Sequence, residues 1–302
     1  MKEPEKIRAE VACTYAKALR GEGGCCAPLA ALCGAADRHA PPSSAREAGG
    51  RVPKGVAAGL ALYRSEDLAA LPSEAVRGSF GCGNPVAFGE IREGDVVLDL
   101  GSGAGIDLLL AARKVGPGGR VIGVDMTAEM IARARENAAA AGLANIEVRE
   151  GLIEDLPVES ASVDWVISNC VINLSPEKPR VFAEIARVLK PGGRMVVSDL
   201  VARDLPAWVR ESASLYACCI AGAISEEEYV AGLRMAGLAD IEVRERIVYE
   251  PSQVAELLRS YLRDGAGLSS CCGGATALIQ RAAEAVAGEV WSARFHARKP
   301  AA

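Results

Sequence analysis

The sequence predicts a doubly wound α/β fold with a seven-stranded, mostly parallel sheet, an N-terminal extension and a small C-terminal helical insert. Two observations predict it. From residue 94 onward, short apolar runs alternate with longer helix-like stretches, and turn residues separate them. The chain also has 302 residues and is 50% apolar, which is enough to bury a core of that size.

Seven apolar runs are the strand candidates. They span residues 96–100, 120–126, 146–151, 163–174, 194–201, 241–250 and 290–300. Helices are expected at residues 106–116, 127–142, 176–193 and 206–221, and from Ser225 onward. Thr127 is the expected N-cap of the second of these helices, and the Pro-Gly-Gly run at 191–193 is expected to end the third.

The chain divides into three parts. Residues 1–89 form a cysteine-containing extension and cap, with a helix at 7–20, a loop rich in glycine, proline and serine at 21–50, and a short helix at 65–71. Residues 90–202 form the ligand-binding core. Residues 203–302 are expected to bind substrate and to complete the sheet, with a glycine-rich insert around 267–274.

The charge balance limits the partners. Acidic residues outnumber basic ones by 39 to 34, for a net charge of -5, so the basic surface that nucleic acid requires is not expected. The first ten residues contain no apolar segment of a secretory signal, and no apolar run is long enough to span a bilayer. We therefore expect a cytoplasmic protein without nucleic-acid or membrane partners. The sequence predicts no oligomeric state.

A glycine-rich run follows the first predicted strand and indicates a cofactor site, with Asp99, Gly101, Ser102, Gly103 and Gly105 as its candidates. The dinucleotide fingerprint would require a glycine at position 106, where this chain has isoleucine. A carboxylate at position 99 would repel a pyrophosphate but suits an ammonium group.

A second acidic residue ends the next strand. Asp125, beside Met126, can accept the hydroxyls of a ribose. A nucleoside that carries an ammonium and no phosphate suits both carboxylates, because its ribose can bind Asp125 and its ammonium can bind Asp99. S-adenosylmethionine is such a ligand.

The D-x-G-x-G-x-G run, Asp125 and the Leu-Lys-Pro-Gly-Gly-Arg segment at 189–194 together resemble class I S-adenosylmethionine-dependent methyltransferases. The resemblance covers about residues 90–200. It implies a class I methyltransferase sheet and adenine contacts from the end of the third strand, at Ile153 and Glu154. Asn169, at the end of the fourth strand, is a further expected cofactor contact.

Ten cysteines in a long chain without a secretory signal indicate metal, metalloid or redox chemistry. The chain has only two histidines, and neither adjoins a motif, so general-base catalysis by histidine is poorly supported. Cys170 lies at the carboxyl end of a strand, Cys82 lies between two glycines, and Cys219 follows the fifth strand. Thiolates select soft centres, and three of them could form a trigonal site.

Several segments resemble arsenite methyltransferases: Gly-Cys-Gly-Asn-Pro at 81–85, the whole of 167–178, Cys-x-x-Gly-Ala from Cys219, and the last strand. The resemblance implies that Cys82, Cys170 and Cys219 hold As(III), and that Cys25 or Cys26 pairs with Cys82 in a redox step. It also implies arsenite or its thiol conjugates as substrate, methylated arsenicals as products of a detoxification, and thioredoxin or glutathione as reductant.

Two other functions fit the same residues. The chain could methylate a small organic acceptor, with Cys170 merely packing, or it could bind a metalloid without transferring a methyl group. A structural zinc site is the weakest reading, because no C-x-x-C with a matching partner pair is present. Cys218 is expected to be a packing or auxiliary thiol. The Cys271-Cys272 pair could bind an additional metalloid.

Overall fold

The computed structural model describes residues 3–20, 63–79, 81, 83–249, 252, 254–255 and 274–301. Its strands are β1 (Val96–Leu100), β2 (Arg120–Asp125), β3 (Ile146–Glu150), β4 (Val163–Asn169), β5 (Leu189–Ala202), β6 (Ala239–Val248) and β7 (Val290–Arg298). The helices that precede β5 are α1 (Pro4–Arg20), α3 (Ser65–Ala69), α4 (Ser73–Arg77), α5 (Pro85–Phe88), α6 (Ile106–Val115), α7 (Ala128–Ala140), the 3₁₀ turn η1 (Ile172–Leu174) and α8 (Lys178–Val188). Those that follow are α9 (Ala207–Arg210), α10 (Ala213–Ala217), α11 (Glu226–Met235) and α13 (Gly274–Val286).

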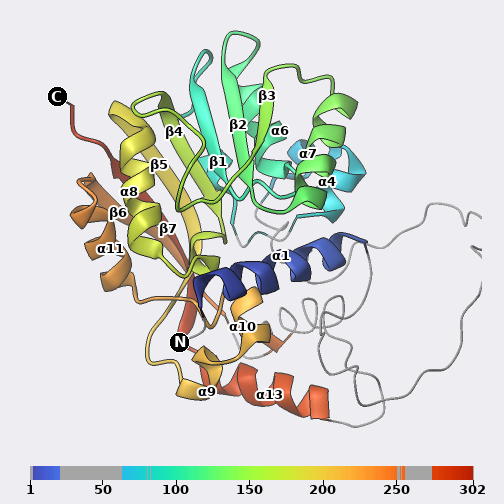
Figure 1. Cartoon of the computed structure of the whole chain (residues 1–302), viewed down its shortest axis with the longest axis vertical. Coiled ribbons are helices and arrows are strands. Elements are labelled where there is room, and N and C mark those ends of the chain that lie inside the picture. Colours follow the sequence, from blue (N-terminus) through green and yellow to red (C-terminus); the bar gives the residue numbers. More distant parts are fainter. Residues whose placement is uncertain are drawn as a thin grey trace, which may run out of the picture.

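The seven strands form one sheet in the order β3-β2-β1-β4-β5-β7-β6 (Figure 1). The first five strands are parallel, and β7 runs antiparallel between β5 and β6. The predicted fold class, a doubly wound and mostly parallel seven-stranded sheet, is confirmed.

The strand order reverses between β1 and β4. From β1 the chain moves outward through β2 and β3, and it returns on the other side of β1 to form β4. The loops that follow β1 and β4 therefore diverge. Ligands of open α/β sheets bind in the crevice that this reversal leaves at the carboxyl ends of the strands.

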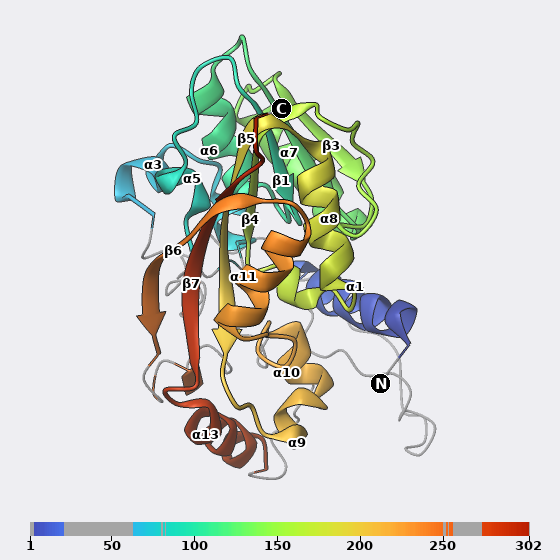
Figure 2. The same ribbon diagram turned by 90° about the vertical axis from the view of Figure 1, so that its left-hand side faces the viewer.

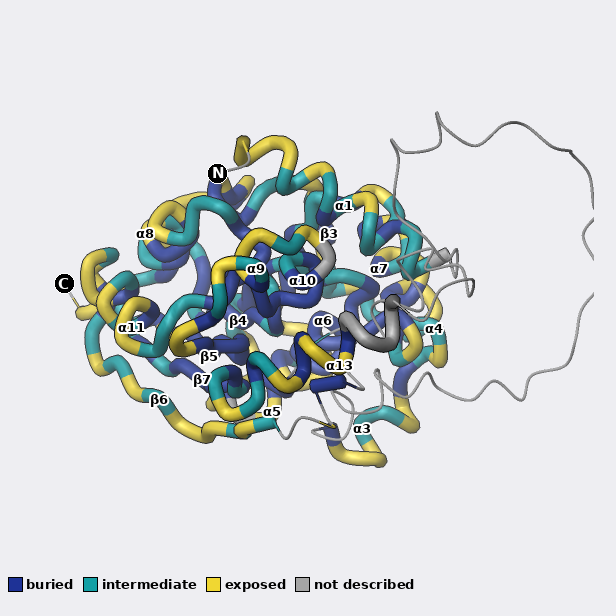
Figure 3. The backbone as a smooth tube through the Cα atoms, turned by 90° about the horizontal axis from the view of Figure 1, so that it is seen from below, coloured by how far each residue is buried: buried dark blue, intermediate teal, exposed yellow. Residues whose placement is uncertain are grey.

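Both faces of the sheet are covered, so its central strands are apolar on both sides. Val97 of β1 belongs to a buried cluster with residues of α6 and α7, whereas the next residue, Leu98, belongs to one with residues of α8 and α11. In that second cluster, Tyr229 stacks on Phe295 with ring centroids 3.9 Å apart. Figure 3 shows β4, β5 and β7 largely buried at the centre, whereas the edge strand β6 is largely exposed.

A third apolar cluster lies beyond the carboxyl ends of the strands. It joins α1, α9, α10 and α13, which Figures 1 and 2 show gathered at that end of the sheet. Cys170, Cys218 and Cys219 are members of this cluster. The crevice is therefore roofed by segments from the two ends of the chain and from the region after β5.

Four predicted elements differ from the observed ones. The fourth strand ends at Asn169, because Cys170 adopts a left-handed φ of 59°. Helix α8 ends at Val188, where β5 already begins in register with β4. The helix expected at 206–221 is divided into α9 and α10, with Ser212 capping the latter. The helix expected at 65–71 ends at Ala69 as α3, and α4 follows separately after Pro72.

Some expectations fall outside the described residues. The loop expected at 21–50, with its cysteines, and most of the glycine-rich insert at 267–274 are among these. None of the described helices combines the length and the apolar character needed to cross a bilayer.

Candidate active site

A cavity lies in the crevice. It is bounded by α1, by the loop after β1, and by the ends of β2, β3 and β4. All of the cofactor candidates predicted from the sequence line it: Asp99, Gly101, Ser102, Gly103, Gly105, Asp125, Met126, Ile153, Glu154 and Asn169. Cys170 lines it as well.

Positive φ angles shape the glycine loop between β1 and α6. Gly101, Gly103 and Gly105 have φ angles of 64°, 51° and 93°, a region in which side chains are strained. A Cβ on Gly101 would also lie 2.4 Å from the side chain of Val171. The backbone N–H of Gly101 donates to the carbonyl oxygen of Val124 at 2.8 Å, which ties the loop to β2.

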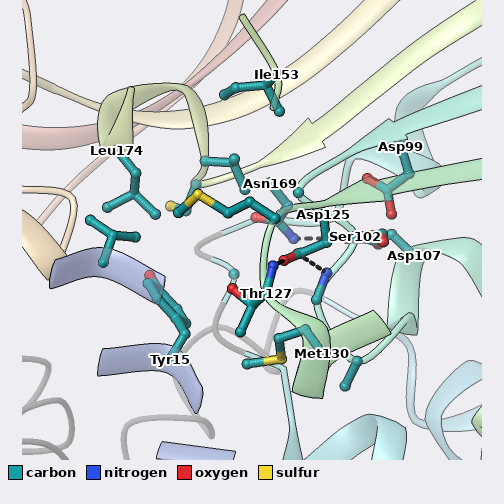
Figure 4. Close-up of a pocket in the computed structure, with 18 of the residues that line it drawn as sticks. Tyr15, Asp99, Ser102, Asp107, Asp125, Thr127, Met130, Ile153, Asn169 and Leu174 are labelled. Atoms are coloured by element: carbon teal, nitrogen blue, oxygen red, sulfur yellow. Dashed lines mark hydrogen bonds between the residues drawn. The ribbon is translucent and has the colours of Figure 1, made fainter. Parts of the chain in front are cut away.

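Asp125 fixes the other side of this loop. Its carboxylate accepts hydrogen bonds from the backbone N–H of Gly103 (2.9 Å) and of Thr127 (2.8 Å), as Figure 4 shows. Burial raises the pKa of Asp125, and these hydrogen bonds oppose the rise. Thr127 is the N-cap of α7 as predicted, although its side chain makes no capping hydrogen bond.

Two further carboxylates are buried in the cavity wall. Asp99 and Asp107 are 2% and 4% exposed. Burial raises the pKa of Asp99 well above its ordinary value, and the charges of Asp107 and Asp125 add to the rise. Burial likewise raises the pKa of Asp107 to about 6. Within the described residues, no lysine or arginine forms an ion pair with these carboxylates, so the cavity favours a cationic ligand.

Asn169 connects Asp107 to the loop before β1. Its amide nitrogen lies 3.1 Å from Oδ2 of Asp107 and 2.8 Å from the carbonyl oxygen of Gly83. Its oxygen accepts the backbone N–H of Gly83 at 3.0 Å. A Cβ on Gly81 would lie 2.3 Å from Asn169, and one on Gly83 would lie 2.3 Å from Ser198. The glycines that flank position 82 are therefore what allows this contact.

Cys170 and Cys219 come together although they are 49 residues apart. The Sγ atom of Cys219 donates to the carbonyl oxygen of Cys170 at 2.9 Å. Both residues have left-handed φ angles, 59° and 62°, which cost roughly 1–2 kcal/mol each for an L-residue. Strain of this kind concentrates at functional sites.

The two sulfurs differ in their surroundings. Cys170 lines the cavity, while Cys219 lies behind it and is 1% exposed. Burial raises the pKa of Cys219 well above its ordinary value, and the charge of Asp199 adds to the rise. Burial also raises the pKa of the adjacent Cys218 to about 12. Both are therefore thiols in this state.

Cys170 itself is disulfide-bonded, whereas Cys218 and Cys219 are free thiols. Cys82, Cys25 and Cys26 lie outside the described residues. In the described part of the chain, no three metal-ligating side chains gather at one point. Cys170 and Cys219 are thus the two predicted sulfur ligands that the structure brings together.

Comparison with known proteins identifies the relatives of this chain. Residues 91–237 match a protein family described as a methyltransferase domain. The chain is 45% identical over 224 residues to the arsenite methyltransferase of Halobacterium salinarum, which covers 74% of this chain and 51% of the relative. It is 42% identical over 169 residues to that of Aquipseudomonas alcaligenes, covering 53% and 48%. The chain spans about half the length of the curated relatives it matches.

A solved structure covers more of the chain. CrArsM, an arsenic (III) S-adenosylmethionine methyltransferase from Chlamydomonas reinhardtii, aligns with a TM-score of 0.57 and 34% identity. The alignment covers 82% of this chain and 74% of that one. The chain belongs to the arsenite methyltransferase family. The class I methyltransferase fold and the family predicted from the sequence are confirmed.

In this arsenite methyltransferase family member, α1 closes one side of the cavity. Arg8 donates from Nε and Nη2 to Glu154 at 3.2 and 3.1 Å, and it also pairs with Glu177. The hydroxyl of Tyr15 donates to the carbonyl oxygen of Ala217 at 3.2 Å. Figure 4 shows Tyr15 on the opposite side of the cavity from Asp99. One helix thus contacts the loop after β3 and the segment that carries Cys219.

Sequence reasoning missed three features of this site. The helix containing Arg8 was predicted, but nothing in its sequence placed it over the crevice. Asp107 had a signal, since it is an acidic residue in the first turn of the helix that follows the glycines. Tyr63, which donates to Oδ1 of Asp107 at 2.9 Å, had none, because it lies 44 residues away along the chain.

Proposed function

We propose that this chain transfers methyl groups from S-adenosylmethionine to trivalent arsenic held by cysteine sulfurs, giving methylated arsenicals. The observation that carries the proposal is the meeting of Cys170 and Cys219 beside an acidic cavity, with the sulfur of Cys219 2.9 Å from the carbonyl oxygen of Cys170. The activity that the names of the relatives state supports the same substrate.

The cavity residues fit S-adenosylmethionine. Asp99 and Asp107 are buried carboxylates without a basic partner in the described part of the chain, and they suit the ammonium of the ligand. Asp125 lies at the end of β2. Each oxygen of its carboxylate can accept a further hydrogen bond, and the hydroxyls of a ribose could donate these bonds. When bound, this cofactor supplies an electrophilic methyl carbon on a sulfonium that departs as a neutral thioether.

Cys82, Cys170 and Cys219 are the sulfur ligands that we assign to arsenic. Thiolates select soft centres. Each thiol would exchange with one hydroxyl of arsenous acid, so that its proton leaves with that hydroxyl as water and a sulfur–arsenic bond forms. The disulfide of Cys170 must first be reduced, because an oxidised sulfur has no free valence for arsenic.

The chain contributes mainly by holding the arsenic in place. With S-adenosylmethionine bound, the arsenic lone pair would face the methyl carbon, and the transfer would need no general base. Holding the two atoms about 3–3.5 Å apart supplies most of the rate advantage. Val11 and Leu174 give the arsenic side of the cavity apolar walls that exclude water.

Methylation formally oxidises arsenic by two electrons. We propose that the thiol of Cys25 or Cys26 returns them by attacking the arsenic-bound sulfur of Cys82. A sulfur–sulfur bond forms, the sulfur–arsenic bond breaks and leaves its electron pair on arsenic, and the proton of the attacking thiol passes to solvent. A small thiol such as glutathione, or thioredoxin, then reduces that disulfide. The reducing cytoplasm, where both are available, is the compartment that suits this cycle.

Single cysteine variants test the proposal. We expect Cys170→Ser and Cys219→Ser each to lower the production of methylated arsenic at least about 100-fold, because each loses one soft ligand. Cys13→Ser, at an exposed position on α1, is the matched control and should retain activity. The measurement is arsenic speciation after incubation with arsenite, S-adenosylmethionine and a thiol reductant.

Two outcomes would contradict the proposal. Full arsenite methylation by Cys219→Ser would remove the sulfur site. If the wild-type protein binds S-adenosylmethionine yet yields no methylated arsenic, an organic acceptor becomes the better assignment. Binding of As(III) without binding of S-adenosylmethionine would instead indicate a metalloid-binding protein.

A further inference from the structure

The segments that follow Cys170 and Cys219 are packed directly against each other. Asn173, in η1, is fully buried. Its carbonyl oxygen faces Gly222 so closely that a Cβ at position 222 would lie 2.1 Å from it. The main chain of the Cys170 segment therefore contacts the main chain of the Cys219 segment at this point, within a few residues of each cysteine.

A buried polar network holds this junction. The side-chain nitrogen of Asn173 donates to Oδ1 of Asp199 at 2.9 Å and to the carbonyl oxygen of Leu200 at 2.5 Å. Asp199 also accepts the backbone N–H of Leu200 at 3.0 Å. Through these bonds, β5 fixes the position of the segment that carries Cys170.

Lys178 supplies the positive charge of the network. From the first turn of α8, its Nζ atom donates to the carbonyl oxygens of Asn173 (3.3 Å) and Ser175 (3.0 Å). The first of these oxygens is the one that Gly222 abuts. The ammonium is thus attached to the joint between the two cysteine segments.

The surroundings of the Lys178 ammonium also affect its pKa. Burial lowers the pKa of Lys178 to about 8, and the charges of Asp199 and Cys219 oppose the fall. In return, Lys178 acts to lower the pKa of the Cys219 thiol, against burial and the charge of Asp199.

We propose that Lys178 is a positioning residue of the arsenic site: through the carbonyl oxygens of Asn173 and Ser175, its ammonium holds the Cys170 segment against the Cys219 segment. The proposal rests on the proposed function. It assigns Lys178 to the arsenic side of the site and to no contact with S-adenosylmethionine, since Lys178 does not line the cavity.

The test compares two substitutions at this position. Lys178→Met removes the charge and the donors but keeps an unbranched side chain, whereas Lys178→Arg keeps the charge. We expect Lys178→Met to weaken arsenite binding about tenfold, which is the scale of one lost charge-assisted contact, and to raise KM for arsenite similarly. Binding of S-adenosylmethionine should stay within about twofold of wild type, and Lys178→Arg should recover most of the loss.

A matched control is available on the same sheet. Lys190 pairs with Asp164 at 2.8 Å at the amino end of β5, away from the crevice. Lys190→Met likewise removes a hydrogen-bonded ammonium from the surface of the same sheet and should leave arsenite binding unchanged. Arsenite binding is measured by equilibrium dialysis with arsenic quantification, cofactor binding by calorimetry, and folding by thermal melting.

Three results would overturn the inference. The first is that Lys178→Met binds arsenite as tightly as the wild-type protein does. Equal losses of arsenite and cofactor binding that track a lower Tm, without recovery in Lys178→Arg, would show a merely structural role. If Cys219→Ser binds arsenite as wild type does, the proposed sulfur site fails and this inference fails with it, a result distinguishable because it appears with Lys178 intact.

Discussion

The cofactor side and the thiol side of the crevice are built in different ways. On the cofactor side, a run of consecutive residues and the end of the next strand are joined by backbone hydrogen bonds, such as that from Gly103 to Asp125. On the thiol side, the segments of two cysteines 49 residues apart meet beside a hydrogen-bond network of the side chains of Asn173, Lys178 and Asp199. The first is specified by local main-chain geometry and the second by long-range packing, so substitutions should impair them separately.

Gly222→Ala should break the thiol side most severely. Its Cβ would lie 2.1 Å from the carbonyl oxygen of Asn173, a main-chain atom that cannot rotate aside. We expect arsenite methylation to fall at least about 100-fold and the free energy of unfolding to fall by roughly 1–3 kcal/mol. Product speciation and denaturant unfolding measure the two effects.

The comparison predicts that this variant still binds S-adenosylmethionine. Gly118→Ala is the control, because a Cβ there has no neighbour within 4 Å and the methyl group should be tolerated. Loss of cofactor binding in a folded Gly222→Ala protein would mean that the two sides are not separable.

Asp107→Asn should act on the cofactor side in two opposite directions. Burial raises the pKa of Asp107 from 3.8 to about 6, so the folded protein binds more protons than the unfolded chain between these values. The stability of the ligand-free protein therefore falls as the pH rises from about 4 to about 6. At pH 7, we expect the variant to be more stable by roughly 1–3 kcal/mol, yet to bind S-adenosylmethionine about tenfold more weakly.

Thermal melting across this pH range, together with calorimetric titration, checks both halves of that expectation. Asp204→Asn, at an exposed site, should change neither the slope with pH nor the affinity. A ligand-free Asp107→Asn protein that is less stable than wild type at pH 7 would contradict the burial argument.

The smallest effects are expected on α1, which contacts both sides. Tyr15→Phe loses the hydrogen bond to Ala217, worth about 0.5–1.5 kcal/mol, and should raise KM for arsenite a few-fold. Arg8→Met loses its bonds to Glu154 and should raise KM for S-adenosylmethionine instead. Steady-state kinetics with each substrate varied in turn would distinguish them, and the same pattern from both variants would refute the division.

The sequence was most informative where the structure is local. The strands, the glycine loop and Asp125 follow from patterns within a few residues, and they lie where the patterns predict. The meeting of Cys170 with Cys219 followed only from the position of each cysteine in the topology and from the family resemblance. The cover formed by α1 and the link from Tyr63 to Asp107 depend on contacts between distant segments, which no local pattern encodes.

The main chain beneath Cys170 has one further consequence. Its backbone N–H donates to the carbonyl oxygen of Ser198 at 2.8 Å, so the sheet anchors this residue just past the end of β4. If Cys170 binds arsenic as proposed, its sulfur would change from disulfide to arsenic ligand at a residue whose main chain the sheet already holds.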